Sequence, residues 1–92
     1  MLAIELTKAA QKALQSVPPK HARQLAEKLM ALRSDPEPHD SAMMKGSALP
    51  YRRVDVGEYR IIYRVEGEAV LVALIGPRND DAVYRAFKRL QT

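Results

Sequence analysis

The chain has 92 residues, of which 47% are hydrophobic and 28% charged, and this balance suits one small folded domain rather than a disordered segment. It has no cysteine, so disulfides and thiolate metal sites are excluded, and the composition fits a reducing, cytoplasmic setting. No apolar stretch approaches the roughly 20 residues of a membrane span, and the first residues do not resemble a signal peptide. The net charge of +4 suits a nucleic-acid or ribosome partner.

The first third of the chain is predicted to form a short strand and a helical hairpin. Residues 2–6 predict a short strand, because Leu2, Ile4 and Leu6 alternate with Ala3 and Glu5. Thr7 is a predicted N-cap for a helix that ends at the sequence SVPP, residues 16–19. A second helix begins at these prolines, which the first turn of a helix tolerates, and is predicted to run to about Arg33.

Residues 34–50, SDPEPHDSAMMKGSALP, are predicted to form a long connection, because they are rich in turn-forming residues. His39 lies here among Asp35, Glu37 and Asp40. The spacing of these four residues matches no established pattern of metal ligands, so a solvated loop is the better interpretation.

From Tyr51 the pattern changes to period two, and the segments YRRVDV and YRIIYRV around Gly57-Glu58 predict a β-hairpin with a type II′ turn. A two-residue turn pairs Asp55 with Arg60 across the two strands. The face predicted to lie on the core carries Val54, Val56, Tyr59, Ile61 and Tyr63. The opposite face carries Arg53, Asp55, Arg60, Ile62 and Arg64, so alternation alone gathers three arginines there.

The last third predicts a buried strand and an amphipathic helix. Residues 69–75 are almost entirely apolar, as in a central strand. Arg78 follows in a turn, Asn79 is a candidate N-cap, and Asp80-Asp81 suit the positive end of a helix dipole. The predicted order is β-α-α-β-β-β-α, a small α+β fold in a single domain over residues 1–92, with a mostly antiparallel sheet packed by a helical hairpin.

The residues best suited to chemistry are the arginines of the hairpin, Arg78 and a tyrosine six residues later, Tyr84. A guanidinium group can bind two phosphate oxygens at once, and it stays charged at any working pH. RNA carries its own nucleophile, the 2′-OH, so cleavage requires only alignment, charge neutralisation and proton transfer. The structural alternative is an ordinary cross-strand ion pair between Asp55 and Arg60, with Tyr84 as a packing residue.

Residues 51–85 resemble the C-terminal half of the RelE/ParE toxin superfamily. The marks of the resemblance are Gly57-x-Tyr59-Arg60-x-x-Tyr63 and Gly76-x-Arg78, followed by Tyr84. The resemblance implies a RelE-like fold and a toxin of a type II toxin–antitoxin system. Such a toxin is a ribosome-dependent mRNA endonuclease (an mRNA interferase) that acts in the ribosomal A site without metal or cofactor, inhibits translation, and is silenced by a cognate antitoxin protein.

The resemblance also implies roles for individual residues. Arg60 and Arg78 are expected to bind the phosphate and stabilise the transition state, and Tyr84 to act as the base or to align the 2′-OH. The further candidates for RNA binding are Arg52, Arg53 and Arg64. Strand parity favours Arg53 over Arg52, because Arg53 shares a face with Arg60.

One residue departs from the pattern of the superfamily. Asp55 occupies a face-matched position at which the RelE-like branch has a basic residue, and a carboxylate there can neutralise Arg60 or repel phosphate. Two alternatives therefore stand beside the nuclease. One is a ParE-like inhibitor of DNA gyrase without nuclease activity, and the other is a catalytically degenerate member that only binds its antitoxin.

Overall fold

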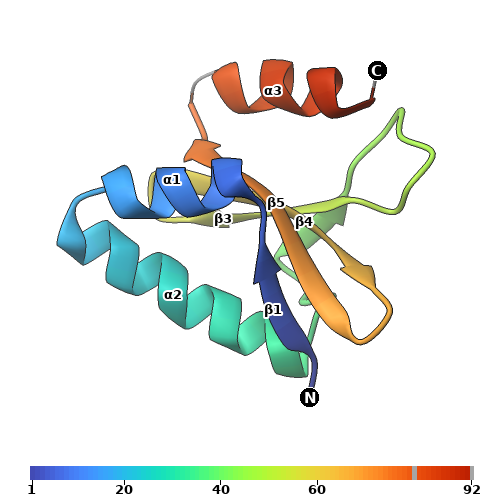
Figure 1. The fold of residues 1–92 in the computed structure, drawn as a ribbon, viewed down its shortest axis with the longest axis horizontal. Helices are drawn as coiled ribbons and strands as arrows, with labels where there is room; N and C mark the ends of the chain where they lie inside the picture. Colours follow the sequence, from blue (N-terminus) through green and yellow to red (C-terminus); the bar gives the residue numbers. More distant parts are fainter. Residues whose placement is uncertain (80, 92) are drawn as a thin grey trace.

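The protein is described by a computed structural model that covers residues 1–79 and 81–91. Figure 1 shows a sheet with helices on both faces. Helices α1 (Lys8–Ser16) and α2 (Pro19–Ser34) cover one face, and α3 (Ala82–Gln91) covers the other. The strands are β1 (Ala3–Leu6), β2 (Ser41–Met43), β3 (Arg52–Val56), β4 (Tyr59–Glu66) and β5 (Ala69–Pro77). No helix within the described residues is long and apolar enough to span a membrane.

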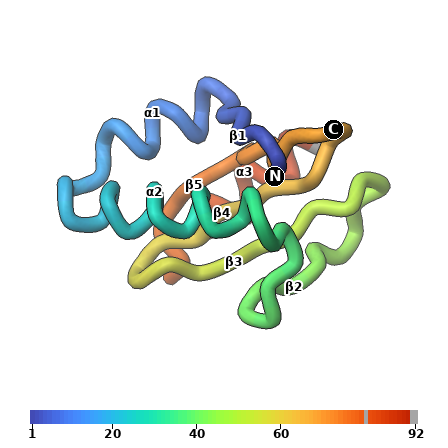
Figure 2. The backbone as a smooth tube through the Cα atoms, turned by 90° about the horizontal axis from the view of Figure 1, so that it is seen from below, coloured from blue at the N-terminus to red at the C-terminus, as the bar shows by residue number. Residues whose placement is uncertain are grey.

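The five strands lie in the order β1-β5-β4-β3-β2, and Figure 2 shows the same chain from below, turned by 90° from the view of Figure 1. β1 runs parallel to β5, and the other neighbouring strands are antiparallel. Thr7 joins the first strand to α1 as predicted, because its Oγ1 accepts a hydrogen bond from the backbone N–H of Ala10 (3.1 Å) and donates one to the carbonyl of Ala73 (2.7 Å). The predicted α+β fold with a mostly antiparallel sheet is confirmed.

The connection between α2 and the hairpin contains a strand that the sequence pattern did not predict. β2 pairs with the edge of β3, and it places Ser41 opposite Val54 and Met43 opposite Arg52. Three residues are too few to show the alternation of apolar and polar side chains by which a strand is recognised in a sequence. Contacts from other elements hold this segment in place instead.

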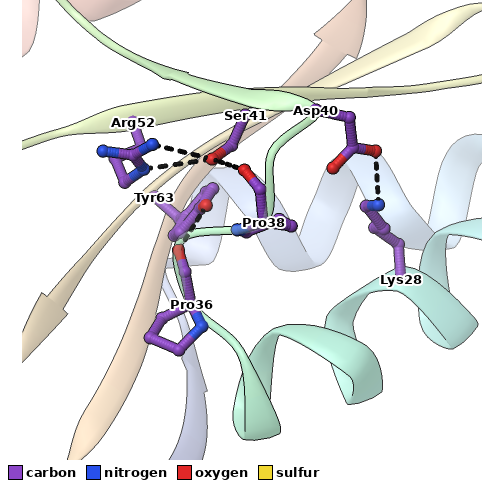
Figure 3. Close-up of polar contacts among 7 residues, drawn as sticks. All are labelled: Lys28, Pro36, Pro38, Asp40, Ser41, Arg52 and Tyr63. Carbon is purple, nitrogen blue, oxygen red and sulfur yellow. Dashed lines mark hydrogen bonds and ion pairs between the residues drawn. The ribbon is translucent and has the colours of Figure 1, made fainter.

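Figure 3 shows how these contacts fix the connection. Ser41 Oγ donates to the carbonyl of Pro38 at 2.7 Å and accepts two hydrogen bonds from the guanidinium of Arg52, at 2.9 and 3.1 Å. The hydroxyl of Tyr63 donates to the carbonyl of Pro36 at 2.7 Å. On α2, Lys28 Nζ forms an ion pair with Asp40, again at 2.7 Å. The connection is therefore tied to both the sheet and the helical hairpin.

The β3–β4 hairpin has the predicted register. Asp55 lies opposite Arg60, and Val56 lies opposite Tyr59, across the turn at Gly57-Glu58. Gly57 has a φ of 58°, and no described residue other than glycine has a positive φ. A positive φ at the first turn position alone is the signature of a type II′ turn, so this prediction is also confirmed.

Both faces of the sheet are apolar at their centres. The predicted core face packs against α1 and α2, and it buries Val54, Ile61 and Tyr63. On the other face Ile62 is fully buried beneath α3, in a cluster with Phe87. The face that carries the arginines is therefore a second core at its middle, with charge gathered beside it.

The helix α3 begins later than predicted. It starts at Ala82, and the first helical hydrogen bond joins the N–H of Arg85 to the carbonyl of Asp81 at 2.9 Å. Asn79 is therefore not the N-cap of α3. The backbone N–H of Arg78 donates to the carbonyl of Glu58 (3.0 Å), and this bond keeps the stretch before α3 attached to the hairpin turn. The predicted role of Asp80 at the helix dipole lies outside the described residues.

Candidate active site

The hydroxyl of Tyr84 lies between two arginines from two different strands. Arg53 Nη1 on β3 donates a hydrogen bond to the Tyr84 hydroxyl at 2.9 Å. Arg60 Nη1 on β4 donates to the same oxygen, and the Arg60 guanidinium lies 5.3 Å from the centroid of the Tyr84 ring. The structure thus brings together three of the residues predicted for the site, from β3, β4 and α3.

Asp55 holds Arg60 from the other side. Arg60 Nε lies 2.6 Å from Asp55 Oδ1, and Arg60 Nη2 lies 3.1 Å from Asp55 Oδ2, so the pair is bidentate as well as cross-strand. The hydrogen bond from Arg60 lowers the pKa of the Asp55 carboxyl, and the charges of Arg78 and Arg53 lower it further. The same bond raises the pKa of Arg60. Asp55 is therefore an ionised carboxylate, and every nitrogen of the Arg60 guanidinium has a partner.

Arg78 follows directly after β5 and is the third arginine near Asp55. Its backbone is fixed by the hydrogen bond to the carbonyl of Glu58, while the residue itself is exposed at the end of β5. Its charge contributes to the lowered pKa of Asp55, which places its guanidinium within electrostatic reach of the carboxylate. The arginines outnumber the single carboxylate here, so the site keeps a surplus of positive charge suited to a phosphate.

Two other arginines from the sequence prediction lie apart from Tyr84. Arg64, further along β4, forms an ion pair with Glu66 (3.3 Å), and its guanidinium lies 5.5 Å from the ring centroid of Tyr51. A hydrogen bond to Tyr51 is the main cause of the raised pKa of Arg64. Arg52 points to the other face of the sheet, where it binds Ser41, as Figure 3 shows. Strand parity separates Arg52 from Arg53, as predicted.

A glycine permits the close approach of α3 that brings Tyr84 to Arg60. Gly76 on β5 lies directly opposite Arg60 in the sheet. A Cβ atom at Gly76 would lie 3.3 Å from the Cβ of Val83, the residue before Tyr84. The absence of a side chain at this position therefore sets the distance between α3 and the strand that carries Arg60.

If the candidate site cleaves RNA, replacing Gly76 with valine is expected to lower the cleavage rate by roughly ten- to a hundredfold, because small displacements of a reacting group have effects of this size. The added methyl groups push Val83, and with it Tyr84, away from Arg60. Cleavage rates and far-UV circular dichroism, measured together, check this prediction. A double variant that also carries Val83→Ala regains room and should recover part of the rate, whereas full activity in the single variant would contradict the prediction.

If the candidate site cleaves RNA, replacing Asp55 with asparagine is expected to leave the cleavage rate unchanged or to raise it, because Arg60 loses a partner that competes with phosphate. The ion pair contributes roughly 1 kcal/mol or less to stability, since the carboxylate is screened by solvent. The folded pKa of Asp55 lies below its ordinary value of 3.8, so this contribution is present above about pH 4 and is lost as the pH falls further.

Urea unfolding of both proteins between about pH 7 and pH 3 checks the prediction for Asp55. The difference in unfolding free energy should be constant above about pH 5 and should shrink progressively as the pH falls toward the lowered pKa of Asp55. A folded Asp55→Asn protein that no longer cleaves RNA would instead give the carboxylate an essential role in orienting Arg60.

A groove beside Tyr84 was not predicted from the sequence. It has a volume of about 680 Å³. The end of β2 and the chain after it, β3 and α3 line it with Met43, Met44, Lys45, Gly46, Arg53, Tyr84, Phe87 and Lys88. The sequence does indicate that Lys88 lies beside Tyr84, because the two residues are four positions apart and therefore share a face of the helix. Nothing in the pattern of residues 43–46 indicated that they would meet α3.

The comparison with protein families decides the identity of the chain. Residues 4–82 match the family described as the ParE toxin of the type II toxin–antitoxin system parDE. The chain belongs to the RelE/ParE toxin superfamily. The matched stretch of this toxin includes Arg53, Arg60 and Arg78 and ends before Tyr84. No curated protein is similar enough to match it.

Solved structures confirm the RelE-like fold of this toxin. A chain of the archaeal RelE–RelB complex from Pyrococcus horikoshii OT3 is 29% identical, with 84% of this chain and 94% of that chain covered and a TM-score of 0.74. The isolated E. coli RelE toxin is 19% identical, with 98% and 99% covered and a TM-score of 0.74. A chain of the RelBE2 toxin–antitoxin complex from Mycobacterium tuberculosis is 19% identical, with 84% and 98% covered and a TM-score of 0.72.

Proposed function

We propose that this RelE/ParE toxin is a ribosome-dependent mRNA endonuclease that inhibits translation by cutting mRNA in the ribosomal A site. The observation that carries the proposal is the convergence of Arg53 and Arg60 on the hydroxyl of Tyr84, with the charge of Arg78 near enough to lower the pKa of Asp55. A tyrosine surrounded by guanidinium groups has the components that RNA cleavage requires, namely a group for proton transfer and cations for the phosphate.

In the proposed reaction the 2′-oxygen of one nucleotide attacks the phosphorus of the adjacent phosphodiester. A P–O2′ bond forms, the P–O5′ bond breaks, and the products are a 2′,3′-cyclic phosphate and a 5′-hydroxyl. The phenolate form of Tyr84 accepts the proton of the 2′-OH and becomes the neutral phenol, or the neutral hydroxyl of Tyr84 aligns the 2′-OH, and a proton from solvent completes the leaving 5′-oxygen. Arg60 and Arg78 bind the phosphate oxygens, whose negative charge increases in the transition state.

Without RNA, the hydroxyl of Tyr84 already accepts hydrogen bonds from two arginines of the site. This affects when Tyr84 can take part in proton transfer. In this structure the guanidinium groups of Arg53 and Arg60 both donate hydrogen bonds to the hydroxyl oxygen of Tyr84. The phenolate form of Tyr84 can therefore take up the proton of the 2′-OH once one guanidinium moves off its oxygen. We infer that a scissile phosphate draws Arg60 or Arg53 onto itself, so that substrate binding prepares the tyrosine for proton transfer.

An inhibitor of DNA gyrase is the second candidate function. Two observations favour it: the matching family is that of the ParE toxin, and Asp55 neutralises part of the charge on Arg60. Gyrase poisons of this fold need not keep Arg60, Arg78 and Tyr84 together. Their joint presence therefore supports the nuclease over the gyrase inhibitor.

We also propose a cognate antitoxin as the protein partner of the toxin. Relatives with this fold have been crystallised in complex with the antitoxin RelB. The toxin exposes large apolar side chains at Met30, Met43, Leu49 and Leu90, which a protein partner can cover.

Expression of the chain in growing cells tests the proposed function. Protein synthesis should stop before DNA replication does, and co-expression of the neighbouring antitoxin gene should restore growth. Incorporation of labelled methionine and labelled thymidine, followed over time, measures the two processes. Continued protein synthesis together with double-strand DNA breaks would favour the gyrase inhibitor instead.

A further inference from the structure

Asp55 occupies the side of Arg60 that is best suited to bind a phosphate. The Nε and Nη2 atoms of a guanidinium present two parallel N–H groups, and this fork fits both a carboxylate and a phosphate. In the structure both atoms donate to the Asp55 carboxylate, at 2.6 and 3.1 Å. The remaining nitrogen, Nη1, donates to the hydroxyl of Tyr84. A phosphate can therefore bind Arg60 through the fork only after the carboxylate has left it.

Of the two partners, Asp55 is the one that can leave. The Arg60 side chain is 12% exposed and its guanidinium lies against the ring of Tyr84, whereas the Asp55 side chain is 39% exposed. β2 pairs with β3 only as far as Val54, so no strand of the described residues pairs with Asp55 on that edge. A hollow of about 260 Å³ adjoins the ion pair, and its lining includes Arg53 beside Asp55 and Arg60. The carboxylate can therefore turn toward solvent, and an anion can enter between the two arginines.

We propose that Asp55 is an autoinhibitory residue, whose carboxylate holds the place of a substrate phosphate on Arg60 until RNA displaces it. This inference rests on the proposed function, because the scissile phosphodiester is the group that takes the place of the carboxylate. An exposed ion pair is weak, so a phosphate can displace Asp55. The carboxylate is nevertheless part of the same hairpin and competes at a high effective concentration. Asp55 therefore lowers the affinity for RNA without closing the site.

The expected consequence is a preference for mRNA that is held in place. A competitor within the site raises the substrate concentration needed for half-saturation, and it has no effect once substrate saturates the site. The ribosomal A site presents mRNA at a fixed position and thus at a high effective concentration, whereas free RNA lacks this advantage. Asp55 therefore suppresses the cutting of free RNA more than that of ribosome-bound mRNA, and contributes to the dependence on the ribosome.

Binding of an uncleavable RNA tests the proposal away from the ribosome. The probe is a short single-stranded RNA that is 2′-deoxy at the cleaved position, and fluorescence anisotropy measures its affinity. Asp55→Asn should bind it about 3- to 30-fold more tightly than the parent, because the variant loses a competing ion pair and a negative charge beside the phosphate.

Glu37→Gln is the matched control for this binding experiment. It removes the same charge from a carboxylate that pairs with Arg52 of β3 at 3.9 Å, on the other face of the sheet. Screening by salt should keep its effect on affinity below about twofold. Equal affinities of the parent and Asp55→Asn, or equal gains in the two variants, would overturn the proposal.

Kinetics on programmed ribosomes distinguish autoinhibition from a role of Asp55 in the chemistry. A competitor that must leave before substrate binds affects the ground state and the transition state alike. Asp55→Asn should therefore lower KM and leave kcat unchanged. A lower kcat in the folded variant would show that Asp55 positions Arg60 for the reaction, and would overturn the proposal.

The parent toxin provides a second measurement that needs no variant. In toxin labelled with ¹⁵N at its arginines, the Nε–H signal of Arg60 should shift when the RNA probe is added, because Nε exchanges a carboxylate for a phosphate. The Nε–H of Arg33, which donates to the carbonyl of Leu2 at 2.7 Å, should not shift. An unmoved Arg60 signal in the saturated complex would show that Asp55 stays in place, against the proposal.

The binding measurements separate this inference from the proposed function, because they require no cleavage. Tighter binding by Asp55→Asn in a toxin that cuts no mRNA on ribosomes would keep Asp55 as a competitor at a phosphate site and remove the nuclease. Cleavage by a toxin whose Asp55→Asn variant gains no affinity would keep the nuclease and remove the autoinhibition.

Discussion

Replacing Tyr84 with phenylalanine is expected to lower single-turnover cleavage of ribosome-bound mRNA by at least about a hundredfold, the usual contribution of a general acid or base. The substitution removes one oxygen, the atom on which Arg53 and Arg60 converge, and leaves the ring in place. Because the ring still packs against the second core cluster, the melting temperature should change little.

Tyr63 provides a matched control for the loss of a tyrosine hydroxyl. Its hydroxyl donates to the carbonyl of Pro36 within the core, on the face of the sheet away from α3. Tyr63→Phe should lower the unfolding free energy by about 1 kcal/mol and leave the cleavage rate of the folded protein unchanged. If Tyr84→Phe cuts at the parental rate, the tyrosine is a packing residue and the proposed chemistry fails.

Replacing Arg78 with alanine is expected to lower cleavage by about 100- to 1000-fold, by analogy with residues that stabilise a developing negative charge. Arg78 is exposed, and its structural bond is made by its backbone, which the substitution preserves. The stability should therefore stay within about 0.5 kcal/mol of the parent. Parallel thermal melts and single-turnover assays measure the two effects.

Arg23 is the matched control for this second prediction. It is an exposed arginine on α2, on the opposite face of the sheet, so Arg23→Ala removes the same charge at a distance from the candidate site. Long-range electrostatic attraction of RNA would be weakened by both variants alike, most strongly at low salt. Equal losses of activity in the two variants would show that Arg78 acts through net charge and not at the reacting phosphate.

The hairpin part of the site could be predicted because it depends on local rules. A two-residue turn and the alternation of side chains place Arg53, Asp55 and Arg60 on one face, and the structure confirms this register. The same rule separates Arg52 from Arg53. The position of Tyr84 was different: spacing placed it on a helix, but only the family resemblance put that helix over the arginines.

Other features could not be predicted because they depend on contacts between distant segments. β2 forms a strand because it pairs with the edge strand β3. Arg52 binds Ser41 within β2, and Lys28 binds Asp40 directly before it. The burial of Ile62 among arginines follows from the packing of α3, which periodicity in the hairpin does not encode. The groove beside Tyr84 likewise forms where the end of β2 and β3 meet α3.

Cleavage by purified toxin on ribosomes programmed with a defined mRNA tests the central claim most directly. The account predicts a single cut in the A-site codon that leaves a 2′,3′-cyclic phosphate and a 5′-hydroxyl, and that disappears when the attacking 2′-OH is replaced by hydrogen. Tyr84→Phe should nearly abolish the cut. Intact mRNA after prolonged incubation with folded toxin, or a cut that persists in the 2′-deoxy substrate, would contradict the assignment of Arg53, Arg60, Arg78 and Tyr84 to an RNA-cleaving site.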